Sequence, residues 1–368
     1  MPPRERGEGV STVTGRTGTL RAVVVDDSRF MRSLISDALD DGGIDVVATA
    51  ENGREAVEVV RDHAPDVVTM DVEMPEMNGI EAVERIMERH PTPILMLSAH
   101  TGEGASVSFE ALDRGAVDVF AKPGGEVSAG VSRVGEQLVE TVRAVAAADV
   151  TDGSAGDASE RTGMATADAD ASAVVVIASS TGGPNAVEQV LASIPADAGV
   201  SVIVVQHMPA GFTGRFAERL DGRSELSVRE ATDGDRIGPG EALVVPGDYH
   251  LEVSHASGAR VRVSLDSDDR GESIQPAADV TMRSAASAVD GALVGVVLTG
   301  MGRDGAAGVE AIHDADGRIL AQDEATCAIY GMPKRAVETG CVDDVLPIDE
   351  MADGVLDAAA SFVEREAA

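Results

Sequence analysis

The sequence contains little lysine, few aromatic residues and almost no cysteine. Lys122 and Lys334 are the only lysines among 29 basic residues, tryptophan is absent, and aromatic residues make up 2% of the chain. Two cysteines, Cys327 and Cys341, are too few for a disulfide framework, so we expect reduced thiols. No apolar run approaches the roughly 18 residues of a membrane span, and residues 1–19 lack a signal-peptide core. These absences predict a cytoplasmic protein.

Acidic residues are in large excess, which excludes some partners. The chain has 64 acidic residues and a formal net charge of −35, spread along its whole length. Such a charge argues against a nucleic-acid partner, because the phosphate backbone would repel it. It is typical of proteins from organisms with molar salt in the cytoplasm, where the Debye length shortens to about 3 Å. We therefore interpret the acid excess first as a halophilic solvation feature.

The length and composition predict two globular domains. The chain has 368 residues, of which 43% are hydrophobic. Residues 149–170 consist mainly of small and polar residues, a composition typical of a flexible linker. The expected organisation is a disordered tail at 1–19, a first domain at 20–148, a linker at 149–172 and a second domain at 173–368.

Strand and helix patterns alternate regularly in the first domain. The apolar strands are expected at 20–25, 46–50, 67–70, 94–97 and 117–121. Helical patterns lie near 31–39, 55–61, 79–89, 105–114 and 127–148. Five βα units of this kind predict a flavodoxin-like, five-stranded parallel sheet.

Polar side chains follow several of these strands, where the carboxyl ends of parallel strands meet. Asp26, Asp27 and Asp71 would bring three carboxylates together, which repel one another unless a cation joins them. Oxygen ligands in an incomplete cage suit Mg²⁺, and a carboxylate can act as a nucleophile toward a phosphoryl group. Lys122 offers a compact positive charge and Ser98 a hydroxyl for the phosphate oxygens.

A simpler explanation exists for single members of this set. Asp27 or Ser28 could cap the helix that follows the first strand. Capping accounts for one acid, but not for the whole set of strand-end residues.

This stretch resembles the receiver domain of two-component response regulators. The matching motifs are Val-Val-Asp26-Asp27-Ser, Thr-Met-Asp71-Val-Glu-Met-Pro, Leu-Ser98-Ala and Lys122-Pro. The resemblance implies that Asp71 is the phosphoacceptor and that Asp26, Asp27 and Asp71 hold Mg²⁺. It also implies that Ser98 and Lys122 sense the phosphoryl group.

One position departs from the receiver pattern. Receivers often carry a switch aromatic three residues before the lysine, where this chain has Val119 followed by Phe120. Neighbouring residues on a strand point to opposite faces. We therefore expect the aromatic switch to be absent or rerouted.

The second domain also has an α/β pattern. Strands are expected at 174–177, 200–205, 241–245, 251–253, 261–265, 292–298 and 319–321. Helices are expected after Gly183, after Phe212, over 277–289 and after Gly305. Turn signals between 233 and 265 predict a small antiparallel hairpin inserted into a doubly wound, mostly parallel sheet.

Three strand ends of this domain carry a serine, a histidine and an aspartate. Ser180 follows the strand at 174–177, on a turn that leads through two glycines into a helix. His207 and Asp304 follow two further strands, and the ends of parallel strands meet at one edge. A nucleophile, a base and a carboxylate that orients the base form a nucleophilic triad.

Each member also has an ordinary interpretation. The Ser180 turn could be a common glycine-rich loop, and Ala178 stands where a G-x-S-x-G elbow has its first glycine. His207 could be an ordinary loop histidine, and Asp304 could cap the next helix.

A dinucleotide-binding site is a more specific alternative for the loop that contains Asp304. Residues 300–305 fit the G-x-G-x-x-G fingerprint, and Asp323 lies near the place of a ribose-binding acid. However, this fingerprint opens a domain, and too few residues follow it here. A regulator whose second domain only binds a partner is the other alternative.

The second domain resembles the catalytic domain of chemotaxis protein-glutamate methylesterases. The matching motifs are Ser-Ser180-Thr-Gly-Gly, Gln-His207-Met-Pro-Ala-Gly-Phe-Thr and Leu-Thr-Gly-Met-Gly-Arg-Asp304-Gly, together with Pro246-Gly247 and Pro333-Lys334. The family usually has Gly-Ala-Ser where this chain has Ala-Ser-Ser, so Ser179 is a weaker second candidate for the nucleophile.

The resemblance implies hydrolysis of glutamate methyl esters on methyl-accepting chemoreceptors, and deamidation of receptor glutamines. Ser180 would form an acyl-enzyme, with His207 as base and Asp304 as its orienting partner, and no cofactor for the ester chemistry. A chemotaxis histidine kinase would phosphorylate the receiver, which would otherwise dock over the catalytic strand ends. The expected oxyanion and loop residues are Thr181, Gly182, Gly183, Met301 and Gly302.

Overall fold

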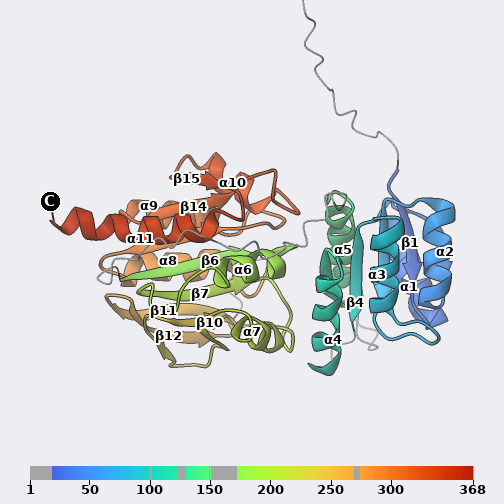
Figure 1. The fold of residues 1–368 in the computed structure, drawn as a ribbon, viewed down its shortest axis with the longest axis horizontal. Helices are drawn as coiled ribbons and strands as arrows, with labels where there is room; N and C mark the ends of the chain where they lie inside the picture. Colours follow the sequence, from blue (N-terminus) through green and yellow to red (C-terminus); the bar gives the residue numbers. More distant parts are fainter. Residues whose placement is uncertain are drawn as a thin grey trace, which may run out of the picture.

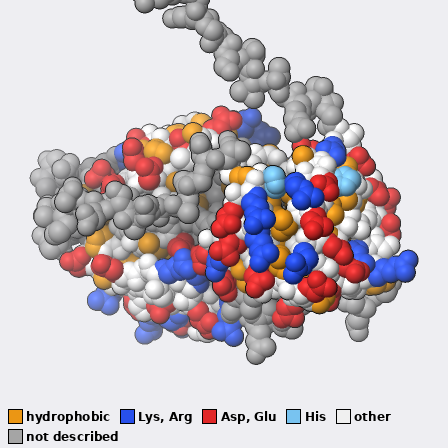
Figure 2. Space-filling model, turned by 45° about the vertical axis from the view of Figure 1, so that its right-hand side comes forward, with side chains coloured by type: hydrophobic (Ala, Val, Ile, Leu, Met, Phe, Trp, Pro, Cys, Tyr) orange, Lys and Arg blue, Asp and Glu red, His pale blue; other side chains and the backbone are white. Residues whose placement is uncertain are grey.

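The computed structural model describes residues 19–98, 102–122, 130–148, 150, 172–268 and 274–367, which form two α/β units (Figure 1). The expected tail at 1–19 and linker at 149–172 lie almost wholly outside the described residues, so both stay predictions. Acidic side chains are scattered over the face drawn in Figure 2 rather than gathered in one patch, as the sequence suggested.

The N-terminal unit is a five-stranded parallel sheet with strand order β2-β1-β3-β4-β5. This confirms the flavodoxin-like prediction. Its strands are β1 (Arg21–Val25), β2 (Asp45–Ala50), β3 (Val67–Asp71), β4 (Ile94–Ser98) and β5 (Asp118–Ala121). Its helices are α1 (Arg29–Asp41), α2 (Gly53–His63), α3 (Gly79–Arg89), α4 (Gly102–Asp113) and α5 (Gly130–Val145).

Side-chain caps fix where three of these helices begin. Ser28, Asn52 and Asn78 each accept a hydrogen bond from a backbone N–H in the first turn of the following helix. Ser28 therefore caps α1, and the exposed Asp27 beside it does not.

The C-terminal unit is built on a seven-stranded parallel sheet, β15-β14-β13-β6-β7-β10-β8. Its strands are β6 (Ala173–Ser179), β7 (Val200–Gln206), β8 (Ser227–Glu230), β10 (Glu241–Val244), β13 (Leu293–Val297), β14 (Arg318–Gln322) and β15 (Asp344–Leu346). Its helices are α6 (Gly183–Leu191), α7 (Thr213–Asp221), α8 (Ala278–Ala288), α9 (Ala306–Asp314), α10 (Met332–Glu338) and α11 (Met351–Ala367).

The central strand β6 is buried on both faces, as its unbroken valine run predicts. Val175 and Ile177 belong to one hydrophobic cluster, and Val174 and Val176 to another on the opposite face. The short strands β8 and β15 were not predicted, because each has few apolar residues and lies at a sheet edge.

The predicted antiparallel hairpin is present as β11 (His250–Ser257) and β12 (Arg260–Asp266). It does not enter the parallel sheet. Instead it pairs with β9 (Arg236–Ile237) as a separate three-stranded sheet. The hairpin packs on α8, which lies between it and the main sheet.

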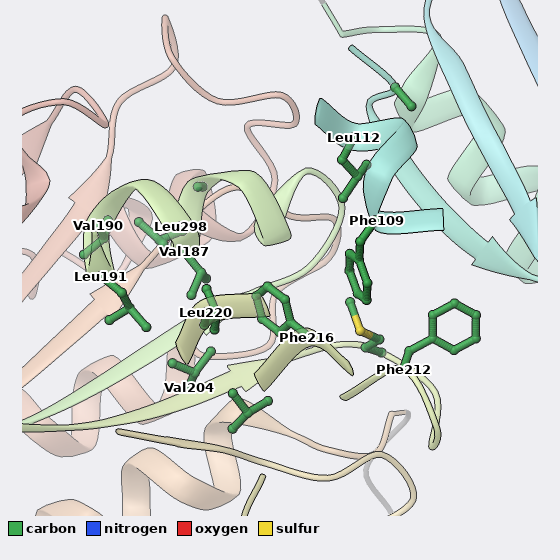
Figure 3. Close-up of a cluster of buried hydrophobic side chains, with 14 of the residues drawn as sticks. Phe109, Leu112, Val187, Val190, Leu191, Val204, Phe212, Phe216, Leu220 and Leu298 are labelled. Atoms are coloured by element: carbon green, nitrogen blue, oxygen red, sulfur yellow. The ribbon is translucent and has the colours of Figure 1, made fainter. Parts of the chain in front are cut away.

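The two units touch through α4 and α7. Phe109 and Leu112 of α4 belong to the same hydrophobic cluster as Phe212 and Phe216 of the C-terminal unit. Figure 3 shows Phe109 pointing from its helix toward Phe216. The N-terminal unit therefore lies against the helix that follows the His207 loop.

Candidate active site and phosphoacceptor site

The carboxyl edge of the N-terminal sheet holds an acidic pocket. Asp26, Asp27 and Asp71 each offer an oxygen within 4.8 Å of the others. Asp26 and Asp71 are buried, whereas Asp27 is exposed, so the cluster opens to solvent on one side. Lys122 Nζ lies 2.8 Å from Asp26 Oδ2 and 2.7 Å from Asp71 Oδ1.

The charges in this pocket are coupled. Burial raises the pKa of Asp71, the ion pair with Lys122 opposes the rise, and Asp26 adds to it, so that the pKa lies above its ordinary value. Burial lowers the pKa of Lys122, but its two carboxylate partners outweigh this and raise it. Three carboxylates against one ammonium leave a negative excess with oxygen donors, and these residues therefore fit a Mg²⁺ ion.

Ser98 adjoins the same pocket. It is the last residue of β4 and is buried, and its carbonyl oxygen accepts the Lys122 N–H at 2.7 Å. The structure thus brings together all the strand-end residues predicted for the receiver. The residues at the predicted switch position, Val119 and Phe120, are both half-buried on β5.

The turn after β6 carries Ser180. Its N–H donates to Thr299 O at 3.0 Å, and its carbonyl oxygen accepts the N–H of Gly183 at 2.8 Å, which closes the turn. Gly182 has a φ of +74°, a left-handed conformation that favours glycine. Helix α6 begins at Gly183. The backbone N–H groups of its first turn therefore lie close to Ser180.

His207 and Asp304 form a close pair. The His207 Nε2 and Asp304 Oδ2 atoms are 2.7 Å apart. Asp304 also accepts the N–H groups of Ala278 at 2.6 Å and Asp279 at 3.0 Å, at the start of α8. Burial raises the pKa of Asp304, but these hydrogen bonds and the interaction with His207 outweigh burial and lower it.

Asp304 therefore remains an anion that holds His207 in place. It accepts the N–H of Gly305 at 3.0 Å as well, but its shortest backbone hydrogen bond, at 2.6 Å, comes from Ala278 of α8. Capping of the next helix alone does not account for it.

The loop after β13 passes directly against Ser180. A Cβ atom on Gly300 would lie 2.7 Å from Ser180 Cβ, so only glycine fits there. Thr299 Oγ1 donates to Thr181 O at 2.9 Å. Met301 and Gly302 follow in this loop. Within the described residues, no hydrogen bond joins the Ser180 hydroxyl to His207, although both residues follow neighbouring strands.

Sequence reasoning missed Gln206, the last residue of β7. Its Oε1 accepts the Ser179 hydroxyl at 2.6 Å, and its Nε2 donates to Ser180 O at 2.8 Å and His207 O at 3.3 Å. Ser179 is fully buried, and its hydroxyl is held by this bond. A polar amide that ends an otherwise apolar strand beside the candidate base is the signal that could have revealed Gln206.

The dinucleotide alternative gains no support here. The carboxylate of Asp323 accepts the backbone N–H of Thr326 at 2.9 Å and its hydroxyl at 2.6 Å. It therefore stabilises its own turn, as Asp residues commonly do.

An acidic, lysine-paired pocket and a serine beside a histidine–aspartate pair, on two units of one chain, are the features of a response regulator with a hydrolase output. Comparison with protein families agrees. Residues 22–128 match the response regulator receiver domain, and residues 175–355 match the CheB methylesterase.

Curated relatives match almost the whole chain. A protein-glutamate methylesterase/protein-glutamine glutaminase of Haloarcula marismortui is 58% identical over 358 residues, which cover 92% of this chain and 97% of the relative. Those of Halobacterium salinarum and Archaeoglobus fulgidus are 55% and 42% identical, with 92% of this chain covered and 98% and 97% of theirs. The chain therefore belongs to the protein-glutamate methylesterase/protein-glutamine glutaminase family, a family of hydrolases.

Solved structures of single domains are also similar. The Thermotoga maritima CheB methylesterase catalytic domain is 39% identical with a TM-score of 0.48, covering 50% of this chain and 98% of its own. The response regulator domain of the same organism's CheB is 44% identical with a TM-score of 0.33, covering 36% and 99%. No helix in the described part of the chain has the length and apolar character of a membrane span.

Proposed function

We propose that this protein hydrolyses glutamate γ-methyl esters on methyl-accepting chemoreceptors and deamidates receptor glutamines, with Ser180 as the nucleophile. The observation that carries the proposal is the 2.7 Å pair of His207 and Asp304 beside the Ser180 turn. The names of its curated relatives, which describe action on protein glutamate and glutamine, support the substrate class.

The reaction follows from the positions of these groups. Ser180 Oγ attacks the ester carbonyl carbon while His207 takes the hydroxyl proton. Asp304 orients the imidazole and stabilises its positive charge. His207 then protonates the leaving group, which departs as methanol from the ester or as ammonia from the amide, and an acyl-enzyme remains. Water, activated by His207, attacks the acyl carbon and releases glutamate and Ser180.

Backbone N–H groups would stabilise the negative charge on the carbonyl oxygen. The candidates lie in the two loops that meet at Ser180, over residues Thr181 to Gly183 and at Met301 and Gly302. Gly182 and Gly302 have φ values of +74° and +84°, and such turns leave N–H groups directed at a ligand.

The N-terminal unit would act as the regulatory switch. Asp71 would accept the phosphoryl group from a chemotaxis histidine kinase, and Asp26, Asp27 and Asp71 would hold Mg²⁺. The ion would neutralise charge during phosphoryl transfer. Lys122 and Ser98 would then bind the phosphoryl oxygens. A cytoplasmic location follows from these partners.

Regulation would work by docking. The carboxyl group of Asp118, at the start of β5, interacts with the Gly182 N–H and the Thr181 side chain in the nucleophile turn. The receiver therefore covers the turn that a receptor helix must reach. Lys122 directly follows β5, so a phosphoryl group that draws Lys122 away from Asp26 acts on the strand that contacts the turn.

Methanol release from methylated chemoreceptor membranes in high salt tests the proposal. We expect Ser180→Ala to fall to background, Ser179→Ala to retain activity, and Asp71→Asn to keep only a weak activity that a phosphodonor does not raise. Removal of residues 1–150 should increase the rate. Wild-type rates in Ser180→Ala would refute the assignment of the nucleophile, and an unchanged or lower rate after the deletion would refute regulation by docking.

A further inference from the structure

Two arginines on one face of the C-terminal unit bind a carboxylate of the receiver. Arg219 Nη2 lies 2.7 Å from Asp113 Oδ1, and Arg223 Nη2 lies 2.8 Å from Asp113 Oδ2. Arg219 belongs to α7 and Arg223 follows one turn later, whereas Asp113 ends α4. Partial burial raises the pKa of Asp113, but the hydrogen bonds from the two arginines outweigh burial and lower it. The carboxylate is therefore bound as an anion.

The same face also binds an aromatic residue of α4. The rings of Phe109 and Phe216 stack with their centroids 5.8 Å apart at 22° (Figure 3). The Arg219 guanidinium lies 5.9 Å from the Phe109 ring centroid, and its Nη1 donates to Phe109 O at 3.0 Å. Phe109 and Asp113 are one helical turn apart, so the α7 face recognises an apolar residue and a carboxylate on one side of a helix.

The charge balance of this contact depends on α4. Arg219 Nε and Arg223 Nη1 each also lie 2.6 Å from an oxygen of Glu188 on α6. With Asp113 present, two guanidinium groups face two carboxylates. Without it, one positive charge is left uncompensated on a chain whose net charge is −35, beside an apolar patch that α4 no longer covers. Such a site retains its affinity for a carboxylate on a helix.

We propose that the face formed by Phe216, Arg219 and Arg223 is the docking surface for the substrate helix, and that α4 occupies it as an internal mimic of that helix. This inference rests on the proposed function. The occupant is a helix that carries an apolar side chain and a glutamate carboxylate one turn apart. Substrates of this enzyme carry glutamate, and each ester hydrolysed adds a further carboxylate.

The position of the face suits this role. Helix α7 begins six residues after His207, and α6, which carries Glu188, begins at the nucleophile turn itself. A helix seated along α7 therefore lies beside the catalytic edge and can present a neighbouring glutamyl ester to Ser180. Phosphorylation would then do more than uncover Ser180, because it would also release the surface that holds the substrate.

Two sets of substitutions that break this contact distinguish mimicry of the substrate helix from simple covering of Ser180. Arg219→Gln/Arg223→Gln removes the docking residues, whereas Asp113→Asn removes the receiver's carboxylate and keeps the arginines. Both full-length variants are assayed in high salt on two substrates. One is N-acetylglutamate γ-methyl ester amide, which is too small to reach α7, and the other is methylated chemoreceptor membranes.

We expect both variants to hydrolyse the small ester several-fold faster than wild type, because both release the receiver. On receptor membranes, Asp113→Asn should also be faster than wild type. The arginine variant should have a kcat/KM about tenfold below that of Asp113→Asn, because its KM is higher. Arg85→Gln/Arg89→Gln, an exposed arginine pair with the same spacing on α3, should match wild type on both substrates.

Equal receptor kcat/KM in Asp113→Asn and the arginine variant would overturn the inference, and so would an unchanged small-ester rate in Asp113→Asn. With the small ester as the substrate, an acidic helical peptide without esters should inhibit hydrolysis by Asp113→Asn. The same peptide should leave hydrolysis by the arginine variant unchanged. Absence of any Ser180-dependent hydrolysis in all proteins would instead refute the proposed function.

Discussion

At the residue scale, two buried amides hold the turn that carries Ser180. Gln206 binds it from β7, and Gln322 acts from the other side through Thr299. Gln322 Oε1 accepts the Thr299 N–H at 2.8 Å, and the Thr299 hydroxyl donates to Thr181 O. Both glutamines are 1% exposed, so each unmade hydrogen bond would leave a buried polar group without a partner. The geometry of Ser180 thus depends on residues that have no role in the proposed chemistry.

Gln206→Glu should lower kcat by about 10- to 100-fold and leave KM nearly unchanged. A carboxylate cannot donate to the carbonyl oxygens of Ser180 and His207, and its charge would repel both. The loss corresponds to about 1–3 kcal/mol, the cost of an unsatisfied buried group. Steady-state methanol release on receptor membranes measures it.

Gln189→Glu provides the control for this change, since Gln189 is exposed on α6. It should behave as wild type. Full activity in Gln206→Glu would show that the turn keeps its geometry without the amide, and a changed KM alone would assign Gln206 to substrate binding.

At the scale of elements, the junction between β6 and α6 is tightly packed. A Cβ atom on Gly183 would lie 2.1 Å from Gln206 Oε1 and 2.9 Å from Ser179 Cβ. We expect Gly183→Ala to destabilise the C-terminal unit by about 1–3 kcal/mol, the usual cost of overpacking. Thermal unfolding should show a lower Tm.

Gly222→Ala is the matched substitution, because its Cβ would meet Glu218 O at an ordinary 3.6 Å. It should leave Tm within error of wild type. An equal drop in both variants would point to a general cost of replacing glycine rather than to the contact with Gln206.

Strand β5 makes the interface between the units sensitive to pH. Asp118 is its first residue, and burial raises the pKa of this carboxyl from 3.8 to about 7. The N–H of Val119, which donates to it at 2.8 Å, and the Gly182 and Thr181 groups oppose that rise. In a separated receiver the group would titrate near its ordinary value. The docked state therefore binds more protons between about pH 4 and 7.

Docking should accordingly be strongest at the acidic end and weaken as pH rises to about 7, by at most about 1.4 kcal/mol per unit. Above that pH the effect should level off. The radius of gyration from small-angle scattering in high salt should increase between pH 5 and 8 in the wild type and stay constant in Asp118→Asn. The exposed Asp45→Asn should behave as wild type. A radius that decreases with pH would contradict the assignment.

The strands and their polar ends could be predicted because buried parallel strands leave continuous valine and isoleucine runs. Asp26, Asp71 and Ser180 all stand directly after or at the end of such runs, and Asp304 lies in the loop that follows another. The contact between α4 and α7 could not be predicted. It joins Asp113 to Arg223 across 110 residues of sequence, and a surface carboxylate on a helix carries no sign of its partner.

At the scale of the whole molecule, the receiver and the hydrolase unit pack against each other and are not merely joined by the chain. The hydrophobic cluster of the receiver that contains Leu97 also packs against Ala328, which belongs to the loop after β14. That loop supplies Ile329, whose carbonyl oxygen accepts the Gly300 N–H at 3.1 Å beside Ser180. The receiver is therefore linked to the loop after β14 and, through Ile329, to the Gly300 loop beside Ser180.

The charge of the whole molecule makes its stability depend on salt. A net charge of −35 on 368 residues repels itself in the compact state, and acidic side chains are scattered over the viewed surface (Figure 2). Raising KCl from about 0.1 M to 3 M shortens the Debye length from about 10 Å to less than 3 Å. We expect the Tm from thermal unfolding to increase steeply over this range.

A variant with fewer surface carboxylates should need less salt for the same Tm. Suitable changes are Glu88→Gln, Asp290→Asn and Glu310→Gln, at exposed positions without ion pairs among the described residues. Sucrose at matched osmolality should not reproduce the difference between the two proteins. A Tm that is independent of KCl, or an equal salt dependence in the neutralised variant, would show that charge repulsion does not set the stability of this protein.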